Sequence, residues 1–245
     1  MTLPLKVLYA LYVALLFGLL GLAAVLLMLA LPGLNRRRWV ARLGARTFLR
    51  LAGMPLRVQG LQHLPPTPCI LVANHCSYLD GVVFTAALPP RFGFVIKREM
   101  ASVPLAGFLL NRIGSQFMAR DRTGQTTRDA RRVMRSAEGG ESMVFFPEGT
   151  FSEEPGLLKF HFGAFAAAQR AGCPLVPAII HGSRTALSPR GELPQPTPLR
   201  IEILEPLAPK PDPGADSVAT LCRQARNAIL DRLQEPDREA ACETQ

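Results

Sequence analysis

The stretch CILVANHCSYLDGVVFTAAL, from Cys69 to Leu88, decides the fold, because a polar turn joins a strand-like run to a helix-like run. Its first part, Cys69–Ala73, is continuously apolar, which is typical of a strand buried on both faces. Its last part, Gly81–Leu88, is expected to be a helix. Ser77 and Asp80 have the S-x-x-D spacing of a capping box, which marks the start of a helix. The stretch therefore predicts a strand–turn–helix unit.

The chain after Pro55 repeats this alternation of β-type and helix-type segments. The expected strands are Leu56–Gln59, Cys69–Ala73, Phe92–Ile96, Ser115–Ala119, Ser142–Phe146, Leu175–Ile180 and Leu199–Leu204. The expected helices are Gly81–Leu88, Thr126–Gly140, Phe162–Gly172 and Ser217–Leu233. This alternation predicts an α/β fold with a mainly parallel, largely buried sheet flanked by helices.

The N-terminal segment is a long apolar run without charge, from Val7 to Leu34. About 20 apolar residues cross a bilayer as a helix, whereas the apolar region of a secretory signal has about 7–15. A basic, amphipathic segment, about Arg36 to Leu51, follows at once and suits the cytoplasmic face of a membrane. We expect a retained membrane anchor, either one helix or a helical hairpin that turns at Pro32-Gly33.

Composition divides the chain into three parts. Residues 1–54 are expected to form the membrane anchor and the basic amphipathic helix. Residues 55–235 are expected to form the α/β domain, and residues 236–245 a flexible tail. The expected location is a bacterial inner membrane, with the α/β domain on the cytoplasmic face.

The net charge of +9 and the pI of about 9.9 favour anionic partners. Nucleic acid is the weaker choice, because zinc-finger, RRM and KH signatures are absent from the sequence. An anionic phospholipid membrane fits better. The five cysteines are scattered without a CxxC pair, which indicates reduced thiols and no zinc site. We expect no metal and no bound cofactor.

His75 lies between the end of a strand and the start of a helix, where ligands bind in open α/β sheets. A carboxylate such as Asp80 can bond one ring nitrogen and leave the other free to take a proton. The plainer alternative is that Asp80 only caps the helix and that His75 is a chance polar residue. The spacing alone leaves both interpretations open.

Three further strand ends carry cationic or small residues that would gather at the same edge of a parallel sheet. Lys97 follows one strand, Arg120 another, and Gly149 and Thr150 a third. Arginine can bind a phosphate through two parallel hydrogen bonds, whereas lysine acts as a point charge. Glycine lets the backbone approach a ligand closely. The alternative is a solvated loop at Lys97 and a simple turn before Gly149.

Four ordered blocks between Val58 and His181 make the chain resemble the membrane-bound glycerolipid acyltransferases, of the lysophosphatidic acid acyltransferase type. The blocks read NHCSYLD, KREMASVPLAG with MARDR, FPEGTFS, and CPLVPAII. The resemblance implies transfer of a fatty acyl group from a thioester, either acyl-CoA or acyl carrier protein, to the hydroxyl of a lysophospholipid. The implied product is phosphatidic acid.

The resemblance also implies roles for individual residues. His75 is the general base and Asp80 orients it, without an acyl-enzyme. The acceptor's phosphate would be bound by Lys97, Arg120, Glu148, Gly149 and Thr150.

One position departs from the family pattern, because Phe151 stands where the family commonly has arginine. Either another cationic side chain substitutes for it, or the acceptor is a different lysolipid. The candidate substitutes are Arg120, Lys159, His161 and Arg184.

Two alternatives remain at this point. Cys76 beside His75 could be a thiol nucleophile, but adjacent residues of an extended chain face opposite ways, so a small buried residue is expected. The whole chain could also be a non-catalytic protein that binds anionic lipid, in which case His75 would be dispensable.

Overall fold

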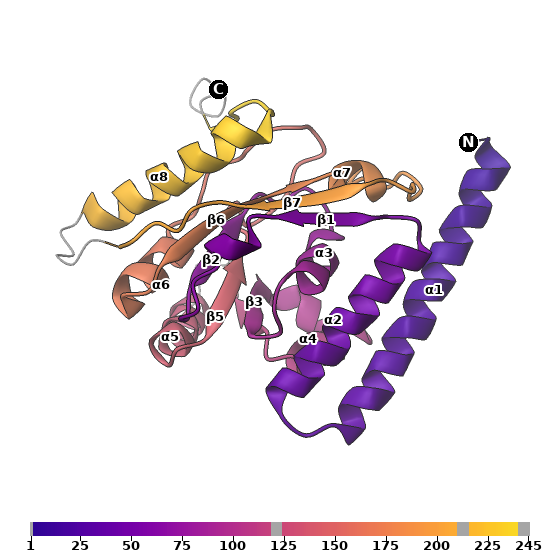
Figure 1. Cartoon of the computed structure of the whole chain (residues 1–245), viewed down its shortest axis with the longest axis horizontal. Coiled ribbons are helices and arrows are strands. Elements are labelled where there is room, and N and C mark those ends of the chain that lie inside the picture. Colours follow the sequence, from indigo (N-terminus) through magenta and orange to yellow (C-terminus); the bar gives the residue numbers. More distant parts are fainter. Residues whose placement is uncertain (1, 119–123, 210–215, 240–245) are drawn as a thin grey trace.

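A computed structural model describes residues 2–118, 124–209 and 216–239. Helices cover both faces of a seven-stranded sheet (Figure 1). The strands are β1 Leu56–Gln59, β2 Ile70–Ala73, β3 Phe92–Lys97, β4 Gln116–Met118, β5 Ser142–Phe145, β6 Leu175–His181 and β7 Leu199–Ile203. Each lies within a residue or two of its expected bounds.

The strand order is β1-β7-β6-β2-β5-β3-β4. Strands β6, β2, β5, β3 and β4 are parallel, while β7 runs antiparallel to β6 and β1 runs parallel to β7. The expected mainly parallel sheet is confirmed. The carboxyl ends of five neighbouring strands therefore share one edge, and β2 is the central strand of the whole sheet.

Successive residues of the central strands point to opposite faces of the sheet and enter different packing clusters. On β2, Leu71 and Ala73 pack in one cluster, while Ile70 and Val72 pack in the other. All four residues are fully buried. Period-2 alternation between two buried faces explains why the sequence of β2 is continuously apolar.

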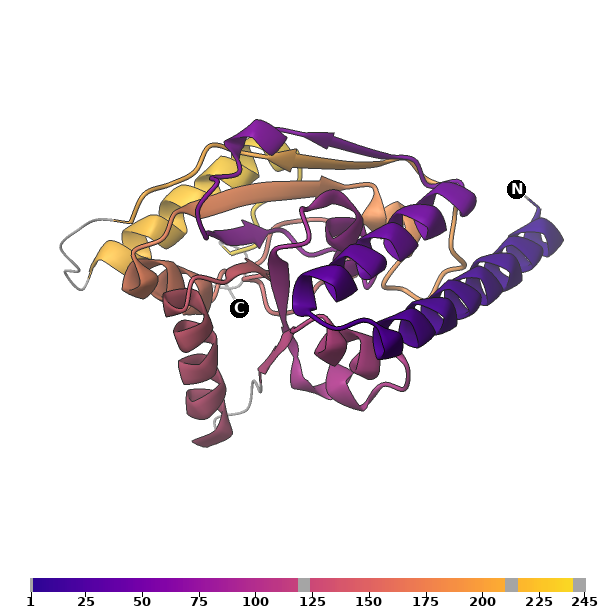
Figure 2. The ribbon, with the colours of Figure 1, turned by 60° about the horizontal axis from the view of Figure 1, so that its bottom comes forward.

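The helices divide between these two faces (Figure 2). Three pack on the face of Leu71: α1 Leu3–Ala30, α2 Leu34–Leu51 and α3 Asp80–Ala87. Three pack on the face of Ile70: α5 Gly124–Glu138, α6 Gly163–Ala171 and α8 Asp216–Leu233. The shorter elements are η1 Leu61–His63, η2 Arg98–Ser102, α4 Ala106–Arg112 and α7 Ser183–Ala186. The sequence had given no sign of α4, which follows the β3 loop.

Helices α1 and α2 form a hairpin that turns at Gly33, whose φ of 85° suits glycine (Figure 1). The Tyr9 hydroxyl donates to the carbonyl oxygen of Ala52 at 2.7 Å, which ties the start of α1 to the end of α2. Met28 of α1 and Phe48 of α2 belong to the same core cluster as strand residues. Residues 1–54 therefore share a core with the α/β domain and do not form a separate unit.

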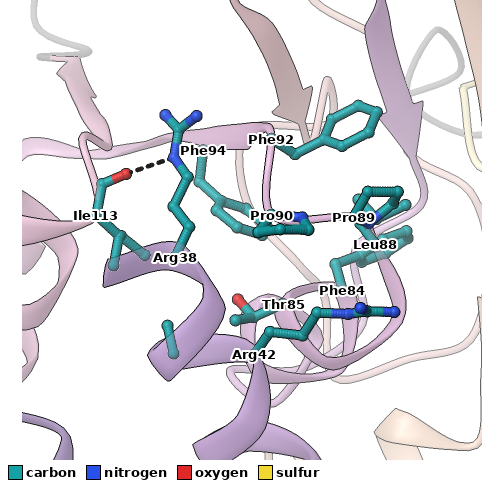
Figure 3. Close-up of a pocket in the computed structure, with 11 residues that line it drawn as sticks. Arg38, Arg42, Phe84, Thr85, Leu88, Pro89, Pro90, Phe92, Phe94 and Ile113 are labelled. Carbon is teal, nitrogen blue, oxygen red and sulfur yellow. Dashed lines mark hydrogen bonds between the residues drawn. The ribbon is translucent and has the colours of Figure 1, made fainter. Parts of the chain in front are cut away.

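Arg38 on α2 also fixes the hairpin to the sheet. Its Nε donates to the carbonyl oxygen of Ile113 at 2.9 Å (Figure 3). Its Nη1 donates to the carbonyl oxygen of Arg91, also at 2.9 Å. The adjoining pocket between α2, α3 and β3 has a volume of about 20 Å³, which is room for about one water molecule. This pocket is too small for a lipid, so Arg38 acts as a structural clamp.

The C-terminal segment corrects one expectation. We expected residues 236–245 to form a flexible tail, but the first of them are packed. Asp237 pairs with Leu157 in a β-bridge and with the Arg226 guanidinium, its Oδ1 lying 2.6 Å from Nη2. Arg238 donates to the Ser152 hydroxyl at 2.7 Å. Because buried Arg226 needs an acidic partner, Asp237 is drawn onto the domain; residues 240–245 lie outside the described part.

Candidate active site

The turn after β2 places His75 at the carboxyl edge of the sheet. Asn74, the first residue after the strand, uses its side-chain amide to bond both the N–H (2.8 Å) and the C=O (3.1 Å) of Ile180 on neighbouring β6. A buried amide with both ends bonded fixes the backbone on either side of it. The chain then leaves the sheet at His75, as expected from the sequence.

Asp80 orients the imidazole of His75. Its Oδ2 lies 2.8 Å from His75 Nδ1 and accepts two backbone N–H groups, from Cys76 at 2.7 Å and Ser77 at 3.0 Å. Asp80 is fully buried, and its Oδ1 has no hydrogen-bond partner within the described chain. The sequence-based pairing of His75 with Asp80 is confirmed as geometry.

The capping box forms only in part. Asp80 accepts the N–H of Ser77, which is one half of the motif. The Ser77 hydroxyl, however, accepts the N–H of Leu79 at 3.1 Å and donates to the carbonyl oxygen of Leu187 at 2.7 Å. The Ser77 hydroxyl therefore does not cap the helix, which begins at Asp80, one residue earlier than expected.

Glu148, in the turn after β5, contradicts its expected role as a ligand for the acceptor. Its Oε1 accepts the backbone N–H of His75 at 2.7 Å, and its Oε2 accepts that of Leu158 at 2.9 Å. The residue is only 4% exposed. Burial raises the pKa of Glu148 to about 8, although the two N–H donors favour the carboxylate. Glu148 therefore braces the histidine backbone from within the protein.

The same turn supplies aromatic neighbours for the imidazole. Gly149, at a φ of 73°, donates its N–H to the carbonyl oxygen of Phe146 at 3.0 Å and closes the turn. The Phe146 ring stacks on His75 with centroids 4.3 Å apart, and Phe151 meets His75 edge-on at 4.6 Å. Phe151 also meets the exposed ring of Tyr78 at 4.7 Å. Sequence reasoning missed Phe146 and Tyr78, because aromatic residues beside a motif carry no signal of their own.

His75 faces a cavity of about 500 Å³. Its wall is mainly apolar and combines residues of α1, α2, α3, β3 and α4 with the two site loops. The lining from the N-terminal hairpin consists of Phe17, Leu20, Gly21, Ala24, Met28, Ala41, Gly44, Ala45 and Phe48. A cavity of this size, with few polar groups, suits an apolar ligand. The apolar N-terminal helix thus forms one side of the site.

The other expected substrate residues have different positions. Lys97, Gly149 and Thr150 line the cavity together with His75. The Lys97 ammonium lies 3.7 Å from the carboxylate of Glu99, and half of the lysine side chain is exposed. Arg120 lies outside the described residues. Lys97, Gly149 and Thr150 are therefore the members of the predicted set that the fold brings to the histidine.

Of the candidate substitutes for the missing arginine, the three that the structure describes are not part of the cavity lining. Lys159 and His161 are exposed, and neither is part of its lining. Arg184 bonds the carbonyl oxygen of Ser152 and lies 3.4 Å from the carboxylate of Glu235. The Arg184 guanidinium thus stabilises the loop after β5 and is already paired with a carboxylate.

Cys76 is a buried residue, as expected. It is 4% exposed, and its Sγ accepts a hydrogen bond from the Asn74 amide at 3.2 Å. Burial, reinforced by the nearby Asp80 charge, raises the thiol pKa well above its usual value. A thiol that resists ionisation is a poor nucleophile.

The site thus combines a histidine oriented by a buried carboxylate with an apolar cavity that the long N-terminal helix helps to line. The chain belongs to the acyltransferase family, since the sequence model described as Acyltransferase matches residues 55–181. It is an acyltransferase related to enzymes of phospholipid synthesis.

Two relatives show the range of the similarity. One is the 1-acyl-sn-glycerol-3-phosphate acyltransferase of Saccharomyces cerevisiae, 25% identical over 89% of this chain and 73% of that protein. Another is the lyso-ornithine lipid O-acyltransferase of Pseudomonas aeruginosa, 32% identical over 86% of each chain. The fold matches the crystal structure of the 1-acyl-sn-glycerophosphate acyltransferase from Thermotoga maritima, with a TM-score of 0.73 and 20% identity over 94% of this chain and 95% of that one.

Proposed function

We propose that this protein transfers a fatty acyl group from a thioester to the free hydroxyl of a lysolipid by general-base catalysis. The observation that carries the proposal is the His75–Asp80 pair at the mouth of the large apolar cavity. The thioester donor is acyl-CoA or acyl carrier protein and acts as a co-substrate. No cofactor enters the reaction.

In the proposed reaction, Asp80 holds the Nδ1 proton of His75 and leaves Nε2 as the base. Nε2 takes the proton of the lysolipid hydroxyl, and the alkoxide oxygen attacks the thioester carbonyl. A C–O bond forms, the C–S bond breaks, and the proton passes from the imidazolium to the leaving thiolate. The Asp80 charge stabilises the imidazolium between these two transfers.

The proposed acceptor class is a lysolipid with an anionic or zwitterionic head. The yeast relative's name supports lysophosphatidic acid as the acceptor and phosphatidic acid as the product. The Pseudomonas relative's name supports a second candidate, a lyso-ornithine lipid. Phe151 favours the second candidate. In the resembling family this position commonly carries arginine, which can bind a phosphate, and phenylalanine cannot.

We propose that either candidate acceptor reaches the site from the membrane. One helix of the described chain, Leu3–Ala30, is long and apolar enough to cross a bilayer, by length and composition. Its inner side packs on the domain through Tyr9, Val13 and Met28, while its outer side exposes leucines. These outer residues are Leu8, Leu11, Leu15, Leu19, Leu22 and Leu26.

This arrangement supports a helix that lies along the membrane, because a spanning orientation would draw Arg46 and Arg50 of α2 toward hydrocarbon. The proposed location of the protein is the cytoplasmic face of a bacterial inner membrane. In Lys6→Cys, the new thiol should react with a membrane-impermeant label that is added on the side of the catalytic domain. Reaction from the opposite side only would instead establish a spanning helix.

The decisive test is His75→Ala in the purified, membrane-reconstituted protein, with lysophosphatidic acid, lyso-ornithine lipid and an acyl thioester. Without the base, turnover should fall by about 10²- to 10⁴-fold, while the protein still folds and binds vesicles. His161→Ala is the matched control, because His161 is exposed and lies outside the cavity lining. Near-normal turnover of His75→Ala would end the base assignment. Vesicle binding by the wild type without thioester consumption would favour a non-catalytic lipid-binding protein.

A further inference from the structure

The cavity mouth has an aromatic rather than a strongly cationic character. Phe151 contacts both His75 and Tyr78, with ring centroids 4.6 and 4.7 Å apart. All three rings line the cavity, and Tyr78 is 70% exposed. A lipid whose hydroxyl reaches His75 therefore brings its head group against Tyr78 and Phe151.

The charges that the described residues bring to the cavity suit a phosphate monoester poorly. Within the described residues, Lys97 is the one lysine or arginine of the lining, and the Glu99 carboxylate lies 3.7 Å from its ammonium. The nearby Arg184 is held by Ser152 and Glu235. A phosphate dianion is best bound by several charge-assisted donors, often from arginine. One lysine beside a carboxylate offers fewer such donors.

The same groups suit a head group that carries both an ammonium and a carboxylate. Aromatic rings attract organic cations through their negative faces, and Tyr78 with Phe151 offers two rings beside the base. The Lys97 ammonium can bind the carboxylate of the head group. The Glu99 carboxylate beside it is 65% exposed and can bind the ammonium of the head group.

We propose that Tyr78 and Phe151 select a lysolipid with an amino-acid head group over one with a phosphate monoester. This inference rests on the proposed acyl transfer and specifies its acceptor. Phe151 then acts in specificity: its ring receives the head group, while His75 performs the chemistry.

The test is a competition between lyso-ornithine lipid and 1-acylglycerol-3-phosphate at equal concentration in the same micelles, with one acyl-CoA and products separated by mass. The wild type should prefer the amino-acid lipid by about tenfold or more in kcat/KM. Phe151→Arg should move the ratio toward the phosphate lipid by at least about tenfold. Tyr78→Leu should lower the preference through KM for the amino-acid lipid, with KM for the phosphate lipid little changed.

Phe162→Arg is the matched control, because it adds the same charge at an exposed phenylalanine outside the cavity lining. Its product ratio should equal that of the wild type. Acylation of the phosphate lipid in preference, with ratios unmoved in Phe151→Arg and Tyr78→Leu, would overturn the inference and leave the acyl transfer standing. Transfer to neither lipid by the wild type would refute the proposed function itself, and this inference with it.

Discussion

Two buried carboxylates flank His75, and they bond in opposite ways. Asp80, from the turn after β2, gathers three N–H donors on Oδ2 and leaves Oδ1 without a partner in the described chain. Glu148, from the turn after β5, accepts one backbone N–H on each of its two oxygens. Asp80 touches the ring of His75, whereas Glu148 touches only its backbone. The difference separates the group that contacts the imidazole, and that we propose serves the chemistry, from the group that holds the loops.

An amide substitution at each carboxylate tests this comparison. In Asp80→Asn, the amide oxygen can occupy the Oδ2 position and keep all three donors. In Glu148→Gln, the amide NH₂ replaces one acceptor and meets a backbone N–H. The first change should therefore mainly affect catalysis, and the second should affect the fold as well.

The largest effect is expected from Asp80→Asn. A neutral amide cannot stabilise the positive charge that His75 gains when it takes a proton, so kcat should fall by about 10²-fold or more, with KM little changed. The melting temperature should stay close to that of the wild type. Steady-state kinetics and calorimetry of the variant provide the check, with exposed Asp231→Asn as the control. If kcat survived, the imidazole would not need Asp80.

A smaller effect on activity is expected from Glu148→Gln. One buried N–H loses its acceptor, which costs about 1–3 kcal/mol of folding free energy. Displacement of the His75 backbone should lower kcat by up to about 10²-fold. Denaturant unfolding and kinetics measure the two effects, and Glu153→Gln, exposed in the same loop, is the control.

The pH dependence of stability distinguishes a buried Glu148 from an exposed one. Burial raises its pKa from 4.5 to about 8 in the folded protein, so between these values the folded state binds more protons than the unfolded state. The stability of the wild type relative to Glu148→Gln should therefore be greatest below about pH 4.5 and fall as pH rises toward 8. A stability difference that grew with pH over this range would mean that the two N–H donors outweigh burial.

The smallest effect is expected from Cys76→Ala, which removes a third side chain beside the pair. Because the thiol is buried and resists ionisation, kcat should stay within about twofold of the wild type, with about 1 kcal/mol of stability lost. Activity measured before and after treatment with a thiol reagent gives a second readout. A loss of kcat as large as that of His75→Ala would indicate that the Cys76 thiol acts as a nucleophile.

The sequence was informative wherever a short-range pattern sets the structure. The apolar run at β2 depends on a strand buried on both faces, and the spacing of His75 and Asp80 depends on a single turn. Both could therefore be predicted without the fold. The partial capping box shows the limit, because Ser77 is drawn away by Leu187, more than a hundred residues later in the chain.

The role of Glu148 could not be read from the sequence. A glutamate in a Pro-Glu-Gly turn can face solvent, a ligand or the protein. Only the pairing of β2 with β5 brings its carboxylate under the backbone of His75. The cavity likewise depends on α1 packing on α2 and α4, since an apolar helix has the same sequence whether it spans a membrane or forms the wall of a pocket.

By itself, the sequence determined the alternation of strands and helices and the long apolar N-terminal segment, and it made the contact between His75 and Asp80 a candidate, because these follow from local periodicity and spacing. Tertiary structure alone decided that Glu148 braces the loop and which aromatic rings from the turn after β5 surround the histidine. The physical reason is that these contacts join segments far apart in the chain, and their geometry exists only once the sheet edge has assembled.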